Sequence, residues 1–289
     1  MQISAPLTGI ILGNGFDIAY NYKTSYSHFV DSEQFIELLK KGNSLAKYIK
    51  EVKNLQNWVD VEIEIGNFSY NMQQSLTQLE FINQTKIFKA EFFALRDALS
   101  LYISNQTSSL SNKKMDKLVE KWFEPAFLDR DRKIFITSFN YHQSDVVNIY
   151  NRFYDHMYER NLLQIHGQAD FYSETPCNIV LGVDENNRRS PEHNFIVKAY
   201  DKNTKATPYL RTILLCDNYI IFGCSMGETD LRYFKPLLSQ KGKKFDIYGF
   251  GDDGLIEIKS RISSICNLDS FITYNEVNFL NSEEYSITR

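Results

Sequence analysis

Short apolar runs recur along this chain, and most of them end in a turn that leads into a segment with helical spacing. Buried parallel strands have this composition, because helices cover both faces of the sheet. The alternation predicts an α/β fold, with a doubly wound, mostly parallel, Rossmann-like sheet. The runs expected as strands are Gly9–Leu12, Lys133–Ser138, Asn161–Ile165, Tyr219–Phe222, Lys244–Tyr248 and Phe271–Val277.

A long helical stretch interrupts the alternation after the first strand. From Tyr26 to Phe127, apolar residues recur at the three-and-four spacing of amphipathic helices. We expect residues 1–25 and 128–289 to form the Rossmann-like domain, and residues 26–127 to form a helical insertion that is either a lid or a cover for one sheet face. Inside it, Trp58–Ile65 alternates like a half-exposed strand between helical neighbours, so both conformations stay open.

Charge and cysteine content exclude several classes of function. The chain has 32 basic and 36 acidic residues and a net charge of −4, so it has no general attraction for nucleic acid or anionic membranes. Its four cysteines are dispersed, without the C-x-x-C pairs of a zinc site. The sequence shows neither a signal peptide nor an apolar run of about 18 residues. These features predict a cytoplasmic protein with no membrane span, no metal and no non-specific nucleic-acid binding.

Glycine and polar residues follow several of the predicted strands. Gly13-Asn14-Gly15-Phe16-Asp17 follows the first strand, Asn140 the second and His166 the third, and the turn Gly223–Asp230 follows a later one. Because ligands bind at the carboxyl ends of strands in open α/β sheets, we expect these residues and Phe250 to share one edge. Glycine lets the backbone approach a phosphate, and the amides after it point toward the anion. A nucleotide ligand with polar catalysis at a ribose is therefore favoured.

The turn Gly223-Cys224-Ser225-Met226-Gly227 also matches the G-x-S-x-G pattern of serine hydrolases. In that fold the acid and the histidine follow the serine, but the last histidine here is His193, so this chemistry is disfavoured. A P-loop is excluded because no G-x-x-x-x-G-K-[ST] run occurs. The turn is better interpreted as a second cradle, in which the Ser225 hydroxyl and the backbone amides bind ribose or phosphate.

Six short motifs, taken in order, resemble those of a known family. The motifs G-N-G-F-D, W-V-D-V-E, S-F-N-Y, I-H-G, L-G-V-D and F-G-C-S-M-G-E-T-D are similar to those of the AbiH family of bacterial abortive-infection proteins, from Gly13 to about Tyr233. That family in turn resembles sirtuin-like NAD-binding domains used in phage defence. The resemblance implies an anti-phage effector that binds NAD and hydrolyses its nicotinamide–ribose bond. A phage-encoded trigger and a homo-oligomer are the further partners expected.

The resemblance also implies a role for each matching residue. Asn140 would place a water molecule and His166 would act as the base. The residues expected to bind NAD are Gly13, Asn14, Gly15, Asp17, Ser138, Asp184, Gly223, Ser225, Asp230 and Phe250. The four-cysteine zinc module of sirtuin deacylases is missing from the sequence, so protein deacylation loses its support.

One departure from the sirtuin pattern affects the nicotinamide pocket. Tyr141 and His142 follow Asn140, where sirtuins have a hydrophobic residue and an aspartate. Asp145 or Asp184 is then a candidate for the missing carboxylate, and the spacing does not decide between them.

Two other functions stay open at this point. The first is a sensor or adaptor that binds NAD or ADP-ribose without turnover and contacts a partner through its helical insertion. The second is a nuclease or nucleotidyl hydrolase that holds a metal with the carboxylates of Asp17, Asp60, Glu62 and Asp184.

Overall fold

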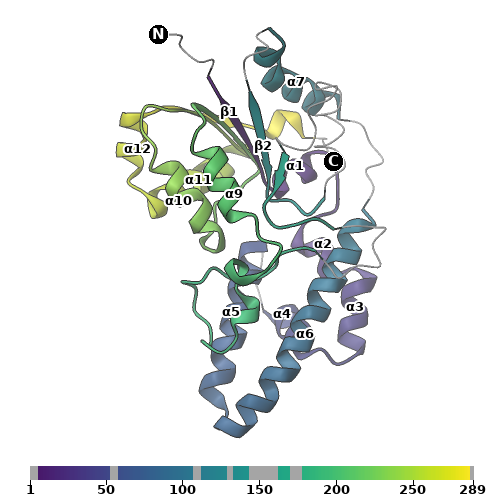
Figure 1. Ribbon diagram of the computed structural model, residues 1–289. Coiled ribbons are helices and arrows are strands. Elements are labelled where there is room, and N and C mark those ends of the chain that lie inside the picture. The colour runs from purple at the N-terminus through teal and green to yellow at the C-terminus, as the bar shows by residue number, and fades with distance from the viewer. Residues whose placement is uncertain are drawn as a thin grey trace.

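One parallel sheet organises the molecule. The computed structural model describes residues 6–52, 58–106, 112–128, 133–142, 162–169 and 178–286. Its six-stranded sheet has the order β3-β2-β1-β4-β5-β6 (Figure 1), and all of the pairings are parallel. The strands are β1 (Thr8–Leu12), β2 (Ile134–Ser138), β3 (Leu162–Gln164), β4 (Asn218–Phe222), β5 (Lys244–Gly249) and β6 (Glu276–Asn281).

The strand order defines where a ligand can bind. In the central strand, Thr8 lies opposite Ile134 of β2 on one side and Asn218 of β4 on the other. The chain winds outward in opposite directions from this point, which is the order of a doubly wound dinucleotide-binding fold. The predicted α/β, Rossmann-like class is therefore confirmed, and its switch point lies between β1 and β4.

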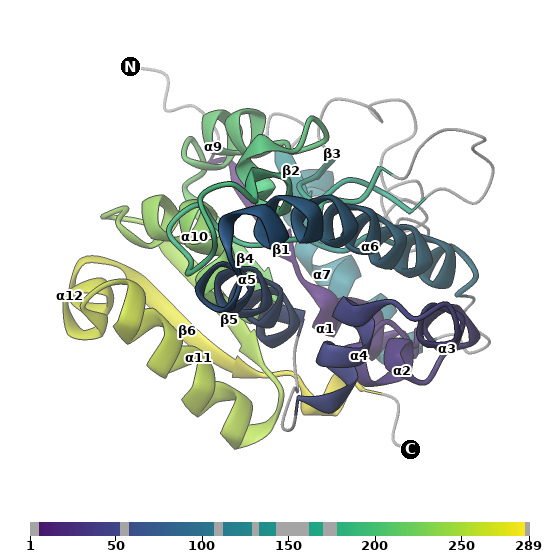
Figure 2. The same cartoon turned by 90° about the horizontal axis from the view of Figure 1, so that it is seen from below.

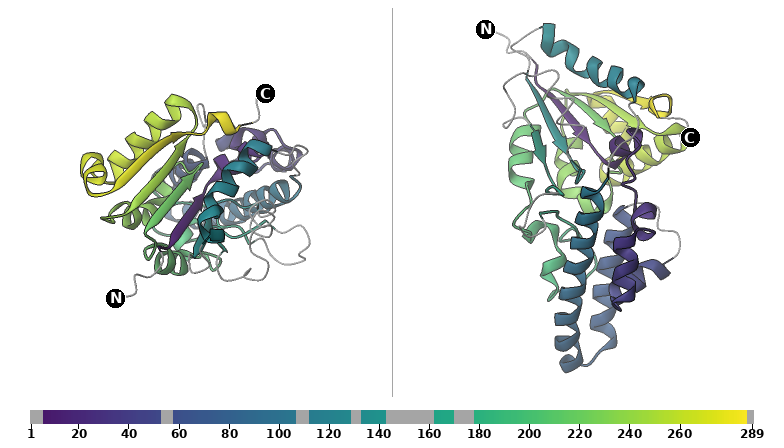
Figure 3. Two further views of the ribbon diagram at one scale, coloured as in Figure 1. Left: turned by 90° about the horizontal axis from the view of Figure 1, so that it is seen from above. Right: turned by 90° about the vertical axis from the view of Figure 1, so that its right-hand side faces the viewer.

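Alternate strand residues face two separate cores, one on each side of the sheet. On one side, Leu12 and Phe222 pack with helices α1 (Asn14–Ala19) and α7 (Lys113–Leu128). On the other side, Ile11 and Ile247 pack with α9 (Ala206–Ile213), α10 (Leu231–Leu238), α11 (Gly251–Ile265) and α12 (Leu268–Tyr274). Figure 3 shows α7 and the α11–α12 pair on these opposite sides. The inner strands β1, β2 and β4 are thus covered on both faces, as their apolar sequences indicate.

The helical insertion lies beyond the carboxyl edge of the sheet (Figures 1 and 2). It comprises α2 (Tyr26–Val30), α3 (Glu33–Lys40), α4 (Ser44–Glu51), α5 (Trp58–Ser75) and α6 (Gln78–Ser104). Side chains cap α2, α3 and α4 at their first turn: Ser25 Oγ accepts from the His28 amide at 3.5 Å, Ser32 Oγ from the Phe35 amide at 3.2 Å, and Asn43 Oδ1 from the Ala46 amide at 2.8 Å. Such caps satisfy amides that have no partner inside the helix.

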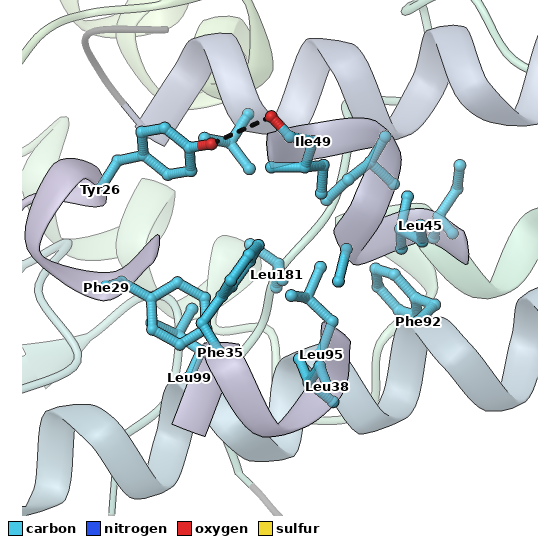
Figure 4. Packing of buried hydrophobic residues seen from close by; sticks show 14 of the residues in the cluster. Tyr26, Phe29, Phe35, Leu38, Leu45, Ile49, Phe92, Leu95, Leu99 and Leu181 are labelled. Carbon is cyan, nitrogen blue, oxygen red and sulfur yellow. Dashed lines mark hydrogen bonds between the residues drawn. The ribbon is translucent and has the colours of Figure 1, made fainter. Parts of the chain in front are cut away.

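The insertion has a core of its own. Phe35, Phe92 and Leu99 are fully buried in it, and the Tyr26 hydroxyl donates to the Ile49 carbonyl at 3.3 Å (Figure 4). Residues from the segment after β3, among them Ile179, Leu181, Val183 and Ile196, pack in the same core. Helix α7 packs on the sheet, although all but its last residue belongs to the residues 26–127 expected as the insertion.

The ambiguous segment Trp58–Ile65 is the start of the 18-residue helix α5. Val61 and Ile65, four positions apart, are both buried in the insertion core, as helical spacing requires. Glu62 is buried too, because a lysine from a later segment meets it. The helix is covered on more than one side, which explains why its sequence lacks a clear helical period.

Two further predictions meet different outcomes. The run Phe271–Val277 was expected as a strand, and this is wrong: α12 extends to Tyr274 and β6 begins at Glu276. The helix expected from Asp145 to Tyr154 lies outside the described residues. Among the residues that are described, no helix is both long and apolar enough to cross a membrane.

Candidate functional site

A cavity of about 430 Å³ lies at the carboxyl edge of the sheet, beside the turns that follow β1 and β4. This volume is in the range of small-molecule sites. The helical insertion lines part of it through Tyr26, Glu62 and Ile103. Ten of the twelve predicted site residues line the same cavity: Gly13, Asn14, Gly15, Asp17, Asn140, His166, Gly223, Ser225, Asp230 and Phe250.

The two glycine turns pack directly against each other at the switch point. A Cβ atom on Gly15 would lie 2.6 Å from Gly223 Cα, and one on Gly13 would lie 2.4 Å from the Gly223 carbonyl oxygen. The Gly15 amide donates to this oxygen at 3.0 Å, and the Phe16 amide donates to the Gly13 carbonyl at 2.9 Å. The prediction that these amides point at an anion is therefore wrong for Gly15 and Phe16. The glycines are required by the close approach of two backbones.

Asn140 is held in a fixed orientation by the turn after β1. Its side-chain Nδ2 donates to Asp17 Oδ1 at 2.9 Å, and its amide donates to Ser138 Oγ at 3.1 Å. Both Asn140 and Asp17 are 4% exposed. Within the described part of the chain, Asn140 Oδ1 is buried and has no hydrogen-bond partner. Buried acceptors are seldom left unpaired, so this oxygen is a point where a ligand or a water would bind.

His166 lies at the end of β3 in an aromatic environment. The rings of Phe139, Tyr141 and Tyr233 have centroids 5.3, 6.3 and 5.8 Å from its ring. Its Nε2 atom lies 3.2 Å from Asp230 Oδ1, in a direction that misses hydrogen-bonding geometry. A carboxylate beside an imidazole stabilises the imidazolium that forms when the ring accepts a proton. His166 thus lies at the cavity beside a group that would stabilise its protonated form.

A buried ion cluster adjoins His166. Lys198 Nζ donates to Glu62 Oε2 at 2.8 Å and to Asp230 Oδ1 at 2.9 Å, and Thr229 Oγ1 donates to Glu62 Oε2 at 2.6 Å. Lys198 is only 1% exposed. The three charged residues come from helix α5, the segment after β3 and the turn after β4. The cluster therefore connects the helical insertion to both halves of the sheet edge.

Burial and mutual attraction compete in setting the pKa values of this cluster. Burial raises the pKa of Asp230, but the charges of Lys198 and His166 outweigh it and hold that pKa well below its usual range. Burial raises the pKa of Glu62, although Lys198 opposes it. Burial disfavours the ammonium of Lys198, but Asp230 and Glu62 raise its pKa above the ordinary value. Asp230 and Lys198 are charged at neutral pH.

Two predicted site residues lie off the cavity lining. Ser138 is buried behind Asn140, where it fixes the backbone. Asp184 closes a turn: its Oδ1 accepts from the Asn186 amide at 3.1 Å and from Asn186 Nδ2 at 3.0 Å. Neither touches the cavity, so their predicted contact with a ligand is not supported by this geometry.

The carboxylates of the metal hypothesis are dispersed. Asp17 and Glu62 line the cavity, but Asp17 accepts from Asn140 and Glu62 from Lys198. In the part of the chain that the structure describes, no three histidine, cysteine, aspartate or glutamate side chains are grouped so that they could hold a metal ion.

Sequence reasoning missed Lys198. It stands in the run Phe195-Ile196-Val197-Lys198-Ala199, where it is the one charged residue among apolar ones. A lysine in such a run is a candidate for burial with a carboxylate partner. Its partners, however, are 136 and 32 residues away in sequence, and no local pattern identifies them.

The fold and the cavity define a class of protein: a doubly wound α/β protein with a cavity of small-molecule size at its switch point, lined in part by a helical insertion. Residues 10–248 match the model of a family described as bacteriophage abortive infection AbiH. The chain belongs to the AbiH family, as its ordered motifs indicated. No curated protein matches it.

Proposed function

We propose that this protein is an anti-phage abortive-infection effector that binds NAD in the cavity and hydrolyses the nicotinamide–ribose bond. Membership of the AbiH family supports the role in abortive infection. The observation that carries the chemistry is that Asn140 and His166, from different strands, line one cavity at the switch point. The sirtuin-like relation that the motifs imply also suggests Asn140 and His166 as the catalytic residues.

The arrangement suits water attack at a ribose carbon. Nicotinamide leaves C1′ with the bonding electron pair, so positive charge develops on the sugar in the transition state. Asp17, Glu62, Asp230 and Glu257 line the cavity, and carboxylates near the sugar favour that charge. Asn140 Oδ1 accepts a hydrogen bond from the attacking water, and His166 takes the proton that the water loses. The products are ADP-ribose, nicotinamide and a proton.

The remaining lining residues would hold the rest of the dinucleotide. Ser225 is exposed at the turn after β4, and its hydroxyl can bond a ribose or phosphate oxygen. Phe250, which is 61% exposed, offers its ring to a base at the end of β5. A phage-encoded trigger, assembly into a homo-oligomer and a cytoplasmic location complete the proposal, because an unregulated NAD hydrolase would deplete its own cell.

Nicotinamide release from NAD by the purified protein tests the proposal. Asn140→Ala and His166→Gln are each expected to lower the rate by about 100-fold or more, the usual contribution of a positioned acid–base group. Asn105→Ala is the matched control, because Asn105 is exposed at the end of α6. Thermal melts of all three variants identify losses that come from unfolding.

Two results would overturn the enzymatic proposal. If Asn140→Ala releases nicotinamide as fast as wild type, Asn140 is not part of the chemistry. If NAD raises the melting temperature but no nicotinamide is released in the presence of a phage lysate, the protein is an NAD sensor or adaptor without turnover. Loss of activity with a chelator would instead support a metal-dependent hydrolase.

A further inference from the structure

The buried lysine of the ion cluster lies close to the proposed base. Asp230 Oδ1 is shared: Lys198 Nζ lies 2.9 Å from it and His166 Nε2 lies 3.2 Å from it. The ammonium and the imidazole are therefore at most about 6 Å apart. Lys198 is 1% and His166 4% exposed, so solvent screens their interaction only weakly.

We propose that Lys198 is a positioning residue that acts through Asp230 to set the charge state of His166, and that helix α5 anchors it through Glu62. This inference rests on the proposed function, in which His166 must accept a proton. Without Lys198, Asp230 would present its full negative charge to the ring and the imidazolium would be favoured. A ring that already carries a proton cannot act as a base.

Among the residues that the structure describes, the charged side chains that meet His166 or its partner Asp230 belong to this cluster. Asp230 and Lys198 come from the turn after β4 and the segment after β3, and Glu62 comes from α5. The phenols of Tyr141 and Tyr233 also lie against the ring. Burial raises the pKa of Tyr233, so this phenol is neutral at physiological pH. The ammonium of Lys198 is the cation of the cluster.

The expected effect follows from Coulomb's law. A unit charge about 6 Å away, at an effective dielectric constant of about 20, changes a titration midpoint by about two pH units. Lys198→Met removes the charge and keeps the length of the side chain, so the midpoint of the His166 ring should rise by about this amount. Lys198→Arg keeps the charge and should keep the wild-type midpoint.

The measurement is an NMR titration of the histidine ring signals, with His166→Gln used to assign the signal. Because the chain contains 5 histidines, this assignment is practical. The titration needs no turnover. If NAD is not hydrolysed at all, the proposed function fails while the charge relation between Lys198 and His166 can still be established.

A second pair of variants is a control for misfolding of Lys198→Met. Lys198→Met leaves Glu62 and Asp230 buried without their cation, which is expected to weaken the fold. Glu62→Gln keeps an acceptor for Lys198 and Thr229, and Glu62→Gln/Lys198→Met removes both partners of the ion pair together. The double variant differs from Glu62→Gln only by the charge of Lys198, so its His166 midpoint should again be higher by about two units.

The outcomes separate a positioning role from a merely structural one. A higher midpoint in both methionine variants, with the wild-type value in Lys198→Arg, supports the proposal. In an active enzyme, the acid limb of the pH–rate profile for nicotinamide release should shift by the same amount as the His166 midpoint. KM for NAD should stay the same. If the midpoint of the double variant lies within about 0.5 unit of Glu62→Gln, Lys198 only fills space and the proposal is refuted.

Discussion

The packing of the two glycine turns predicts a large penalty for Gly223→Ala. Gly223 has φ +67°, and a Cβ atom there would lie 2.6 Å from Gly15 Cα and 2.6 Å from the Phe16 amide nitrogen. Both neighbours are backbone atoms of the other turn, so no side chain can rotate away. The turns that line the cavity must separate to admit a single methyl group.

Two terms contribute to the loss of stability. The left-handed conformation costs a residue with a Cβ about 1–2 kcal/mol. Overpacking against backbone costs about 1–3 kcal/mol more. Gly223→Ala is therefore expected to lower the free energy of unfolding by about 2–5 kcal/mol. Gly42 is the matched control, because it has φ +76° and no atom of the described residues would lie within 4 Å of its Cβ. Gly42→Ala should lower the free energy of unfolding only by the cost of the left-handed conformation, about 1–2 kcal/mol.

Urea denaturation of the two variants and wild type measures the difference. The gain that alanine brings by restricting the unfolded chain is common to both variants and cancels in the comparison. A loss in Gly223→Ala no larger than in Gly42→Ala would show that the turns have room for a Cβ. Gly223 would then be required for a ligand to approach, and the variant would lose NAD binding without losing stability.

The other predictions concern the cores and the ion cluster. Burial lowers the pKa of His193 to about 4. The contribution of His193 to the free energy of unfolding should therefore be at its maximum above about pH 6.5 and decrease by about 3 kcal/mol as the pH drops toward 4. In pH-dependent denaturation, His193→Gln should remove this decrease. Phe88→Ala, at a fully buried site of the insertion core, should cost about 3–5 kcal/mol in urea denaturation, whereas Leu79→Ala, at a 72% exposed site, should cost less than about 0.5; equal losses would contradict the assigned core. Lys198→Met should cost about 3–5 kcal/mol by stranding its two carboxylate partners, and an unchanged denaturation midpoint would show that they do not need it.

The sequence predicts the sheet well because buried strands have a local signature. The apolar runs ending at Leu12, Ser138 and Phe222 become β1, β2 and β4, and their carboxyl ends bring Asn140 and the glycine turns to one cavity. That edge follows from parallel pairing alone, so it could be inferred before any contact was known.

A local sequence pattern does not predict the structure where the residue that stabilises a segment is distant in the sequence. Trp58–Ile65 has the alternating pattern of a half-exposed strand, in which Glu62 is expected to face solvent. In the structure Glu62 is instead buried against a lysine 136 residues away. Phe271–Val277 spans a helix end and a strand start, and β propensity does not distinguish a short helix from a strand. Asp184 is predicted to bind NAD, but its carboxylate closes a turn by accepting from the amide and the side chain of Asn186.

The place of β1 in the sheet has a consequence for how the protein is made. This strand is synthesised first, yet β4 is synthesised about 200 residues later. At a translation rate of roughly 5–20 residues per second, β4 is synthesised roughly 10–40 s after β1. During this time the helices of the insertion can already fold through local contacts. The turn after β4 is synthesised later still, after β1, β2 and β3. A chain that stops before this turn therefore lacks the part of the cavity lining that Gly223, Ser225 and Asp230 supply.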